Sequence, residues 1–156
     1  MQSIRAAITI DRPIHDVFGY VCDIRNDVQW CSTVKAVRTV SAVELGIGCR
    51  YELDVRLFGW RFTSGMRVTD FVPPGRMTML SGHSGNLTYS GIYRLEPAKD
   101  GAGTLLILDV HFIASGYYRM FGPAFGPMLR RTVQRDFVVL KQVLESAPDR
   151  YDQASR

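Results

Sequence analysis

Three side chains combine a residue type and a position that could support acid–base chemistry. His83 adjoins a glycine-rich turn at the end of a predicted strand, and an imidazole there would titrate near neutral pH. Asp136 falls within the apolar stripe of a predicted helix, where an unpaired carboxylate either gains a raised pKa or finds a partner. Tyr89 places a hydroxyl group on the apolar face of a predicted strand. The structural alternatives are a turn histidine, a hydrogen-bonded or ion-paired carboxylate, and a tyrosine bonded to a backbone carbonyl.

Other reaction machinery is not visible in the sequence. There is no Gly-x-Ser-x-Gly nucleophile motif, no His-Glu-x-x-His zinc motif and no phosphate-binding loop. Cys22, Cys31 and Cys49 are far apart and odd in number, which favours reduced, buried thiols over disulfides or a zinc site. We therefore expect no metal and no cofactor.

The composition is that of a globular protein, with 46% hydrophobic and 22% charged residues. The net charge is +4, but the basic residues are spread along the chain and only Arg130, Arg131 and Arg135 cluster. A solvated helix face explains this cluster better than a nucleic-acid surface, which would interleave basic and aromatic residues. The first residues do not show the basic-then-apolar order of a secretory signal, and no uncharged apolar run reaches membrane-spanning length. A cytoplasmic protein without stable membrane insertion is predicted.

Hydrophobic periodicity predicts a sheet framed by helices. Residues 3–10 alternate as a strand, residues 14–21 carry an apolar stripe at helical spacing, and Asn26 and Asp27 can cap a short turn. Residues 128–145 lack Gly and Pro and predict a long amphipathic helix. Between them, turn residues separate six stretches of period two, at 36–42, 49–58, 60–71, 77–82, 87–95 and 104–114.

The predicted class is therefore α+β. Short connections between successive strands imply antiparallel pairing, and the sheet must curve around the last helix, which leaves room for a cavity. The predicted domain organisation is one ligand-binding domain, 1–147, followed by a polar tail, 148–156.

The inward face of these strands carries more hydroxyl groups and methionines than a sealed core needs. Such a wall, apolar with a few polar anchors, is typical of ligand pockets. The alternative is an ordinary core in which methionine fills gaps and tyrosine bonds to the backbone. Together with the apolar face of the C-terminal segment, the candidate ligand-binding residues are Tyr51, Phe62, Ser64, Met66, Met79, Ser81, Tyr89, Tyr93, Phe112, Phe125, Leu129 and Val133.

Residues 115–127 contain two Phe-Gly-Pro sequences among several aromatic residues. We expect an irregular loop that lies over the pocket entrance and moves when ligand binds. The alternative is that its aromatic side chains form a homodimer contact.

Several motifs, in their order and spacing, resemble the SRPBCC superfamily. They are Arg12-Pro13-Ile14-His15-Asp16-Val17-Phe18 with Trp30 after it, Gly46-Ile47-Gly48 before Tyr51, Val-Thr-Asp-Phe-Val-Pro-Pro-Gly-Arg at 68–76, and Gly103-Thr104-Leu105. The resemblance covers about residues 3–146 and is greatest to the polyketide cyclase/dehydrase group, which shares its fold with START-type lipid carriers. It implies the helix-grip fold, in which a curved seven-stranded antiparallel sheet wraps around a long C-terminal helix, with two short helices after the first strand. Cys31 follows Trp30, where aromatase/cyclase enzymes tend to carry proline.

Three functions are compatible with these observations. The first is a carrier, sensor or sequestering protein that holds a lipid- or polyketide-like hydrophobic small molecule. The second is a cyclase, dehydratase or aromatase that uses pocket tyrosine, histidine or aspartate as acid–base groups. The third is a protein-interaction module with a collapsed cavity. The first predicts a small-molecule partner and no nucleic acid.

Overall fold

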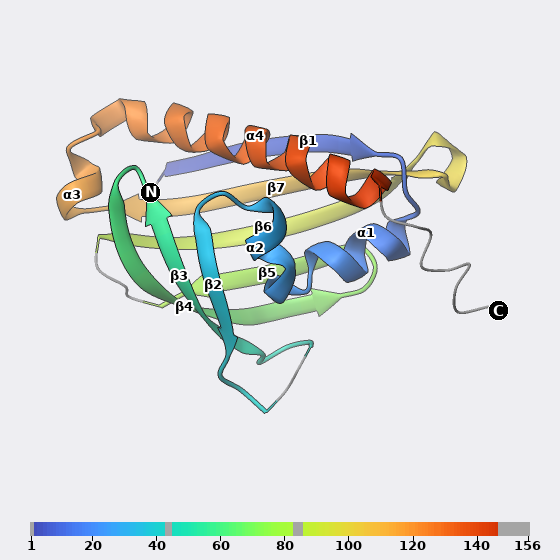
Figure 1. Cartoon of the computed structure of the whole chain (residues 1–156), viewed down its shortest axis with the longest axis horizontal. Coiled ribbons are helices and arrows are strands. Elements are labelled where there is room, and N and C mark those ends of the chain that lie inside the picture. The colour runs from blue at the N-terminus through green and yellow to red at the C-terminus, as the bar shows by residue number, and fades with distance from the viewer. Residues whose placement is uncertain (1, 43–44, 83–85, 147–156) are drawn as a thin grey trace.

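The computed structural model of the protein describes residues 2–42, 45–82 and 86–146. Its strands form one antiparallel sheet with the order β1-β7-β6-β5-β4-β3-β2 (Figure 1). The strands are β1 (Gln2–Ile10), β2 (Val34–Thr39), β3 (Arg50–Leu57), β4 (Trp60–Val72), β5 (Arg76–Ser81), β6 (Leu87–Ala98) and β7 (Gly103–Ala114).

Two short helices follow β1, as the sequence predicts. They are α1 (Ile14–Val21) and α2 (Asp27–Trp30), with the 3-10 turn η1 (Ile24–Asn26) between them. Another 3-10 turn, η2 (Lys99–Gly101), links β6 to β7. The long helix α4 (Phe125–Ser146) contacts β1 at one edge of the sheet and α2 near the other.

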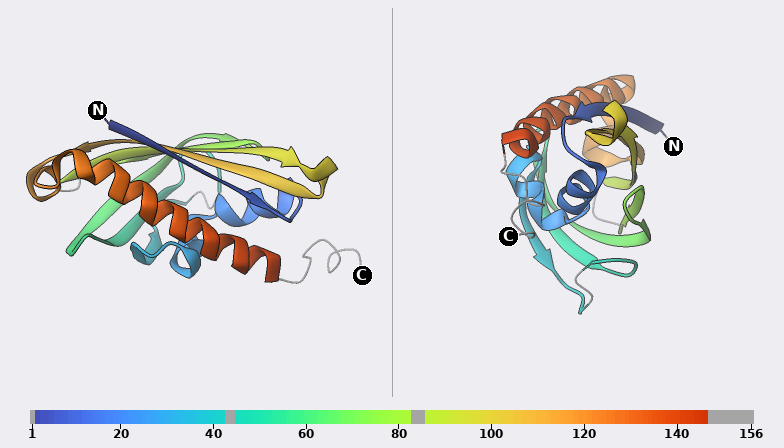
Figure 2. Two further views of the ribbon diagram at one scale, coloured as in Figure 1. Left: turned by 90° about the horizontal axis from the view of Figure 1, so that it is seen from above. Right: turned by 90° about the vertical axis from the view of Figure 1, so that its right-hand side faces the viewer.

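The sheet is strongly curved, and its concave side carries the core. In the end-on view of Figure 2 it curls from β1 round to β2, with α1, α2 and α4 on its open side. Strand β3 shows why the chain folds this way, because Tyr51, Leu53 and Val55 are buried while the residues between them are partly exposed. On α4, Phe137 and Leu140 complete the core from the helix side. This is the helix-grip arrangement, so the predicted fold class is confirmed.

The segment between β7 and α4 differs from the irregular loop that we expected. It contains a short helix, α3 (Gly116–Arg119), and a 3-10 turn, η3 (Gly122–Ala124), and α4 itself begins at Phe125, three residues before the predicted start. Gly116 and Gly122 have positive φ angles of 51° and 55°, so each glycine redirects the chain between helical turns. Pro123 and Pro127 both fall in a first turn, where the missing N–H breaks no helical hydrogen bond.

Asp109 on β7 anchors the outer face of the sheet. Its carboxylate accepts hydrogen bonds from Arg5 Nε on β1 at 2.6 Å and from an Arg94 guanidinium nitrogen on β6 at 2.5 Å. The hydrogen bond from Arg5 is the largest cause that lowers the pKa of Asp109 below its ordinary value of 3.8. This ion-paired group therefore contributes stability above that value, and the contribution is lost as the pH falls through the folded-state pKa.

Replacing Asp109 with asparagine should lower the free energy of unfolding at pH 7 by about 1 kcal/mol or less, because both arginines are partly exposed to solvent. Urea denaturation across a pH series measures this loss. The difference in unfolding free energy between the variant and wild type should shrink below pH 3.8. Glu96→Gln, at an exposed position on β6, serves as the control and should show no deficit. A deficit that stays constant down to the lowest pH would mean that the ion pairs do not stabilise the fold.

Candidate functional site: a cavity beneath the C-terminal helix

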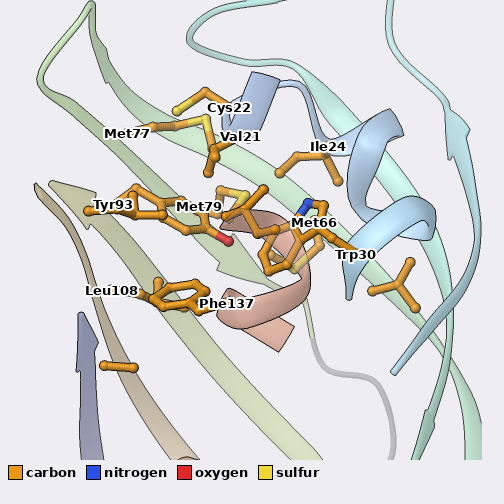
Figure 3. Packing of buried hydrophobic residues seen from close by; sticks show 14 of the residues in the cluster. Val21, Cys22, Ile24, Trp30, Met66, Met77, Met79, Tyr93, Leu108 and Phe137 are labelled. Carbon is orange, nitrogen blue, oxygen red and sulfur yellow. The ribbon is translucent and has the colours of Figure 1, made fainter. Parts of the chain in front are cut away.

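A cavity of about 150 Å³ lies between the concave face of the sheet and the helical elements that cover it. Its wall is almost entirely apolar, with contributions from β3 to β7, from Leu129 on α4 and from the segment 24–34. Figure 3 shows part of this region, where Met66, Met79, Tyr93 and Leu108 approach one another beside the core residue Phe137. The candidate ligand-binding residues that line the cavity are Phe62, Met66, Met79, Tyr89, Tyr93, Phe112 and Leu129.

Other candidates lie near the cavity but do not line it. The Ser64 hydroxyl lies 3.1 Å from the Tyr89 hydroxyl, and Ser81 Oγ accepts a hydrogen bond from the Tyr89 backbone N–H at 2.8 Å. Both serines thus hold Tyr89 in place. Tyr51 is buried and, with Ser81, borders a separate groove at the β3–β5 side of the sheet. Val133 is half-buried on α4 outside the wall.

Two of the three acid–base candidates are not placed in the cavity wall. His83 lies outside the described residues. Asp136 is buried on α4, and burial is the largest cause that raises its pKa, while the nearby Ser32 and Cys31 partly offset this. Asp136 therefore sits where α4 meets the end of α2, and it is not among the residues that line the cavity.

Tyr89 is the one acid–base candidate that the described residues place in the wall. Burial is the largest cause that raises its pKa to about 12, against the opposing effect of the hydrogen bond with Ser64. Burial likewise raises the pKa of Cys31 to about 12. A general base works best when its pKa lies near the operating pH. At neutral pH both groups are protonated, so they can donate hydrogen bonds and are poorly suited to remove a proton.

Sequence reasoning missed two polar residues of the wall, Thr33 and the ionisable Asp27. The sequence pattern assigns it only a capping role, but its side chain is 7% exposed and lines the cavity from α2. Its Oδ1 atom is buried without a hydrogen-bond partner in the described part of the chain. Burial, and then the negative charge of Asp23, raise its pKa well above the usual value. A signal was available, because Asp27 stands at helical spacing from Ile24 and Cys31, which also line the cavity.

The segment of α3 and η3, residues 116–124, packs on the hairpin between β3 and β4. The Tyr117 and Tyr118 hydroxyl groups donate to the backbone carbonyls of Phe58 at 2.6 Å and Leu57 at 3.0 Å. Trp60 stacks on Tyr117 with ring centroids 5.0 Å apart. These aromatic side chains therefore make contacts within the chain and close the end of the sheet beside the cavity.

A second pocket of about 160 Å³ lies on the other side of this closure. Phe112 lines both the cavity and the second pocket, while Tyr118 and Phe125 line only the second. The ring centroids of Phe112 and Phe125 are 5.1 Å apart. An aromatic partition of Phe112, Tyr118 and Phe125 thus separates the cavity from the pocket at α3.

Replacing Gly116 with alanine should destabilise this closure. The residue has a φ of 51°, and a Cβ atom there would collide with the side chain of Asn86. The left-handed conformation alone disfavours alanine by about 1 kcal/mol, and the collision should add to this loss of unfolding free energy. Gly122→Ala is the matched control, because φ is 55° and nothing lies within 4 Å of the added atom. If urea denaturation gives equal losses of unfolding free energy for the two variants, the collision with Asn86 does not contribute to the loss.

A helix-grip fold around an apolar cavity defines a ligand-binding class of domain. The chain belongs to the family described as "Polyketide cyclase / dehydrase and lipid transport", which matches residues 1–146. This bears out the resemblance to the SRPBCC superfamily. No curated protein matches the sequence.

Solved structures with the same fold have low sequence identity. A protein from Thermus thermophilus is 15% identical with a TM-score of 0.79, covering 94% of this chain and 100% of that chain. A START superfamily protein from Mycobacterium smegmatis is 15% identical with a TM-score of 0.70, covering 92% and 94%. The Zhui aromatase/cyclase from a Streptomyces species is 18% identical with a TM-score of 0.70, covering 92% and 90%.

Within residues 2–42, 45–82 and 86–146, no three His, Cys, Asp or Glu side chains come together as a potential metal-binding group. No helix in those ranges is long and apolar enough to cross a membrane.

Proposed function

We propose that the protein binds a small hydrophobic molecule in the cavity and acts as a carrier, sensor or sequestering protein. The observation that carries this proposal is the wall itself, which is apolar on nearly every side and has few polar groups. The family description includes lipid transport, which agrees with such a role. The third hypothesis assumed a collapsed cavity, and the open volume of about 150 Å³ argues against it.

The volume of the cavity limits the size of the ligand that the protein can hold in this conformation. A cavity of 150 Å³ is of the size that accommodates benzene in a protein core. A ligand that buries about 200 Å² of apolar surface would gain about 5 kcal/mol before the entropic losses of binding. Apolar contacts alone therefore give affinities on the order of millimolar. A ligand much larger than benzene requires an outward movement of residues 116–124, and a more tightly bound ligand requires an additional polar contact with the wall.

A cyclase or dehydratase activity is the second candidate. It is favoured by the protonated groups in the wall, above all Asp27 and Tyr89, which could give a proton or a hydrogen bond to a reacting oxygen. The two functions differ in what one polar substitution does. For an enzyme, Asp27→Asn should reduce turnover while binding survives, whereas a carrier has no turnover to lose.

Native mass spectrometry of the protein purified from its source host tests the proposal. We expect a small hydrophobic molecule that copurifies and is released on denaturation, because a native ligand that also forms a hydrogen bond with the wall binds more tightly than apolar contacts alone allow. Gly91→Leu, which fills the cavity, is the matched control and should lack that molecule. The same adduct on both proteins would place the molecule outside the cavity and contradict the proposal. A clean mass for both would favour the enzyme, which releases its product.

A further inference from the structure

Asp27 is a buried acidic group that forms no ion pair with the described residues. It is buried, and its Oδ1 atom has no hydrogen-bond partner among the described residues. Trp30 Nε1, on the same short helix, is also buried without a partner in that part of the chain, so the indole does not donate a hydrogen bond to Asp27. A buried polar group without a partner destabilises a protein. Such a feature commonly marks a functional position.

The groups around Asp27 indicate its protonation state. No described arginine or lysine forms an ion pair with it, and the one charged group that shifts its pKa is the carboxylate of Asp23, which raises it further. A negative charge on Asp27 would also raise the pKa of four neighbouring groups. These groups have raised pKa values and are protonated at neutral pH; they are Cys22, Cys31, Tyr89 and Tyr93. The surroundings therefore favour the neutral carboxylic acid.

The other polar groups of the wall also offer hydrogen-bond donors. Tyr93, on β6, is 4% exposed, and its hydroxyl oxygen points toward the middle of the packed side chains in Figure 3. No hydrogen bond is formed by this hydroxyl within the described chain, whereas the Tyr89 hydroxyl is paired with Ser64. A neutral Asp27 and the Tyr93 hydroxyl thus face one small apolar space with O–H groups.

We propose that Asp27 recognises the ligand by donating a hydrogen bond from its neutral carboxyl group to an oxygen acceptor, such as a ketone carbonyl, on an otherwise apolar molecule. This inference rests on the proposed ligand-binding function and names the chemical class of the ligand. A hydrocarbon would leave the Asp27 oxygen without a partner, whereas a carbonyl compound would satisfy its donor. An amine that pairs with a charged Asp27 is the competing ligand class. It is disfavoured because it would require both a charged Asp27 and an ammonium group to lose their hydration in an apolar cavity.

Two probes of equal shape test this inference. Acetophenone carries a carbonyl oxygen, and α-methylstyrene carries a CH₂ group in the same place. Dissociation constants are measured from the methyl resonances of Met66 and Met79, which line the cavity. Asp27→Leu removes the donor, and Asp27→Asn retains a donor without the acid.

We expect Asp27→Leu to weaken acetophenone binding about tenfold while α-methylstyrene binds equally well or better. In Asp27→Asn the affinity for acetophenone should stay within about threefold of wild type. Because the buried carboxyl group destabilises the free protein, Asp27→Leu should also raise the melting temperature by about 2–4 °C.

Three results would overturn the inference. The first is an equal change of affinity for both probes in Asp27→Leu, which leaves the proposed function intact and removes only the role of Asp27. The second is a lower melting temperature of both variants, which would make Asp27 a structural residue. The third is tighter binding of 1-phenylethylamine than of acetophenone to wild type, lost in Asp27→Asn, which would show recognition of a cation. If neither neutral probe binds wild type, the proposed function itself fails for ligands of this size.

Discussion

Replacing Gly91 with leucine should abolish ligand binding without unfolding the protein. Gly91 lies on β6 in the cavity wall, and a Cβ atom there would make ordinary contacts, 3.6 Å from Leu108 Cδ1 and 4.0 Å from Met79 Cε. The remaining carbons of leucine would occupy space that the ligand needs. We expect the dissociation constant of a cavity ligand to rise about a hundredfold or more. Isothermal titration with α-methylstyrene measures the change.

Gly91→Ala is the matched control for this variant. It adds one carbon without a close contact and removes the extra backbone freedom of glycine from a strand. It should stabilise the protein by about 0.5–1 kcal/mol and keep the affinity within about threefold. If Gly91→Leu folds and binds as tightly as Gly91→Ala, the ligand does not occupy this cavity.

Replacing Phe125 with alanine should give the largest loss of stability. Its side chain is 1% exposed and contacts four rings, those of Phe58, Phe112, Tyr118 and Phe121. Removing a buried phenylalanine lowers the free energy of unfolding by about 3–5 kcal/mol, because the surrounding structure collapses only partly into the space. Urea denaturation followed by circular dichroism measures this loss.

The same segment contains an exposed position for comparison. Met120 is 84% exposed, so Met120→Ala should change the free energy of unfolding by less than about 0.5 kcal/mol. A loss at Phe125 as small as that at Met120 would show that residues 116–124 are not anchored by the aromatic partition. The segment would then be a mobile flap rather than a closure.

The sheet could be predicted from the sequence because alternation and turn residues act locally. Phe62, Met66 and Met79 stand at inward positions of their strands, and the structure places all three in the wall. The alternation of apolar and polar residues predicts which face of the sheet a side chain lies on. It does not predict which space along that face the side chain borders. Tyr51 and Ser81 therefore share the inward face and yet border a different groove.

The polar chemistry of the site could not be predicted so well. Asp27 was missed because α2 has only four residues, so its helical spacing from Ile24 and Cys31 extends beyond that helix and was interpreted only as a turn cap. Asp136 drew attention because it interrupts an apolar stripe, but it lies where the stripe meets Ser32 and Cys31. The helical turns between Gly116 and Ala124 depend on tertiary contacts of Tyr117 and Tyr118, which no local pattern encodes.

The central claim is that an apolar ligand enters the space beneath α4, and methionine methyl NMR tests it most directly. The protein is labelled with ¹³C at its methionine methyl groups and titrated with α-methylstyrene. Met66 and Met79 line the cavity, whereas Met120 is exposed and is not among the residues that line it. We predict that the Met66 and Met79 resonances shift together along one saturation curve while Met120 does not move. A shift confined to Met120, or no saturable shift at all, would contradict the account.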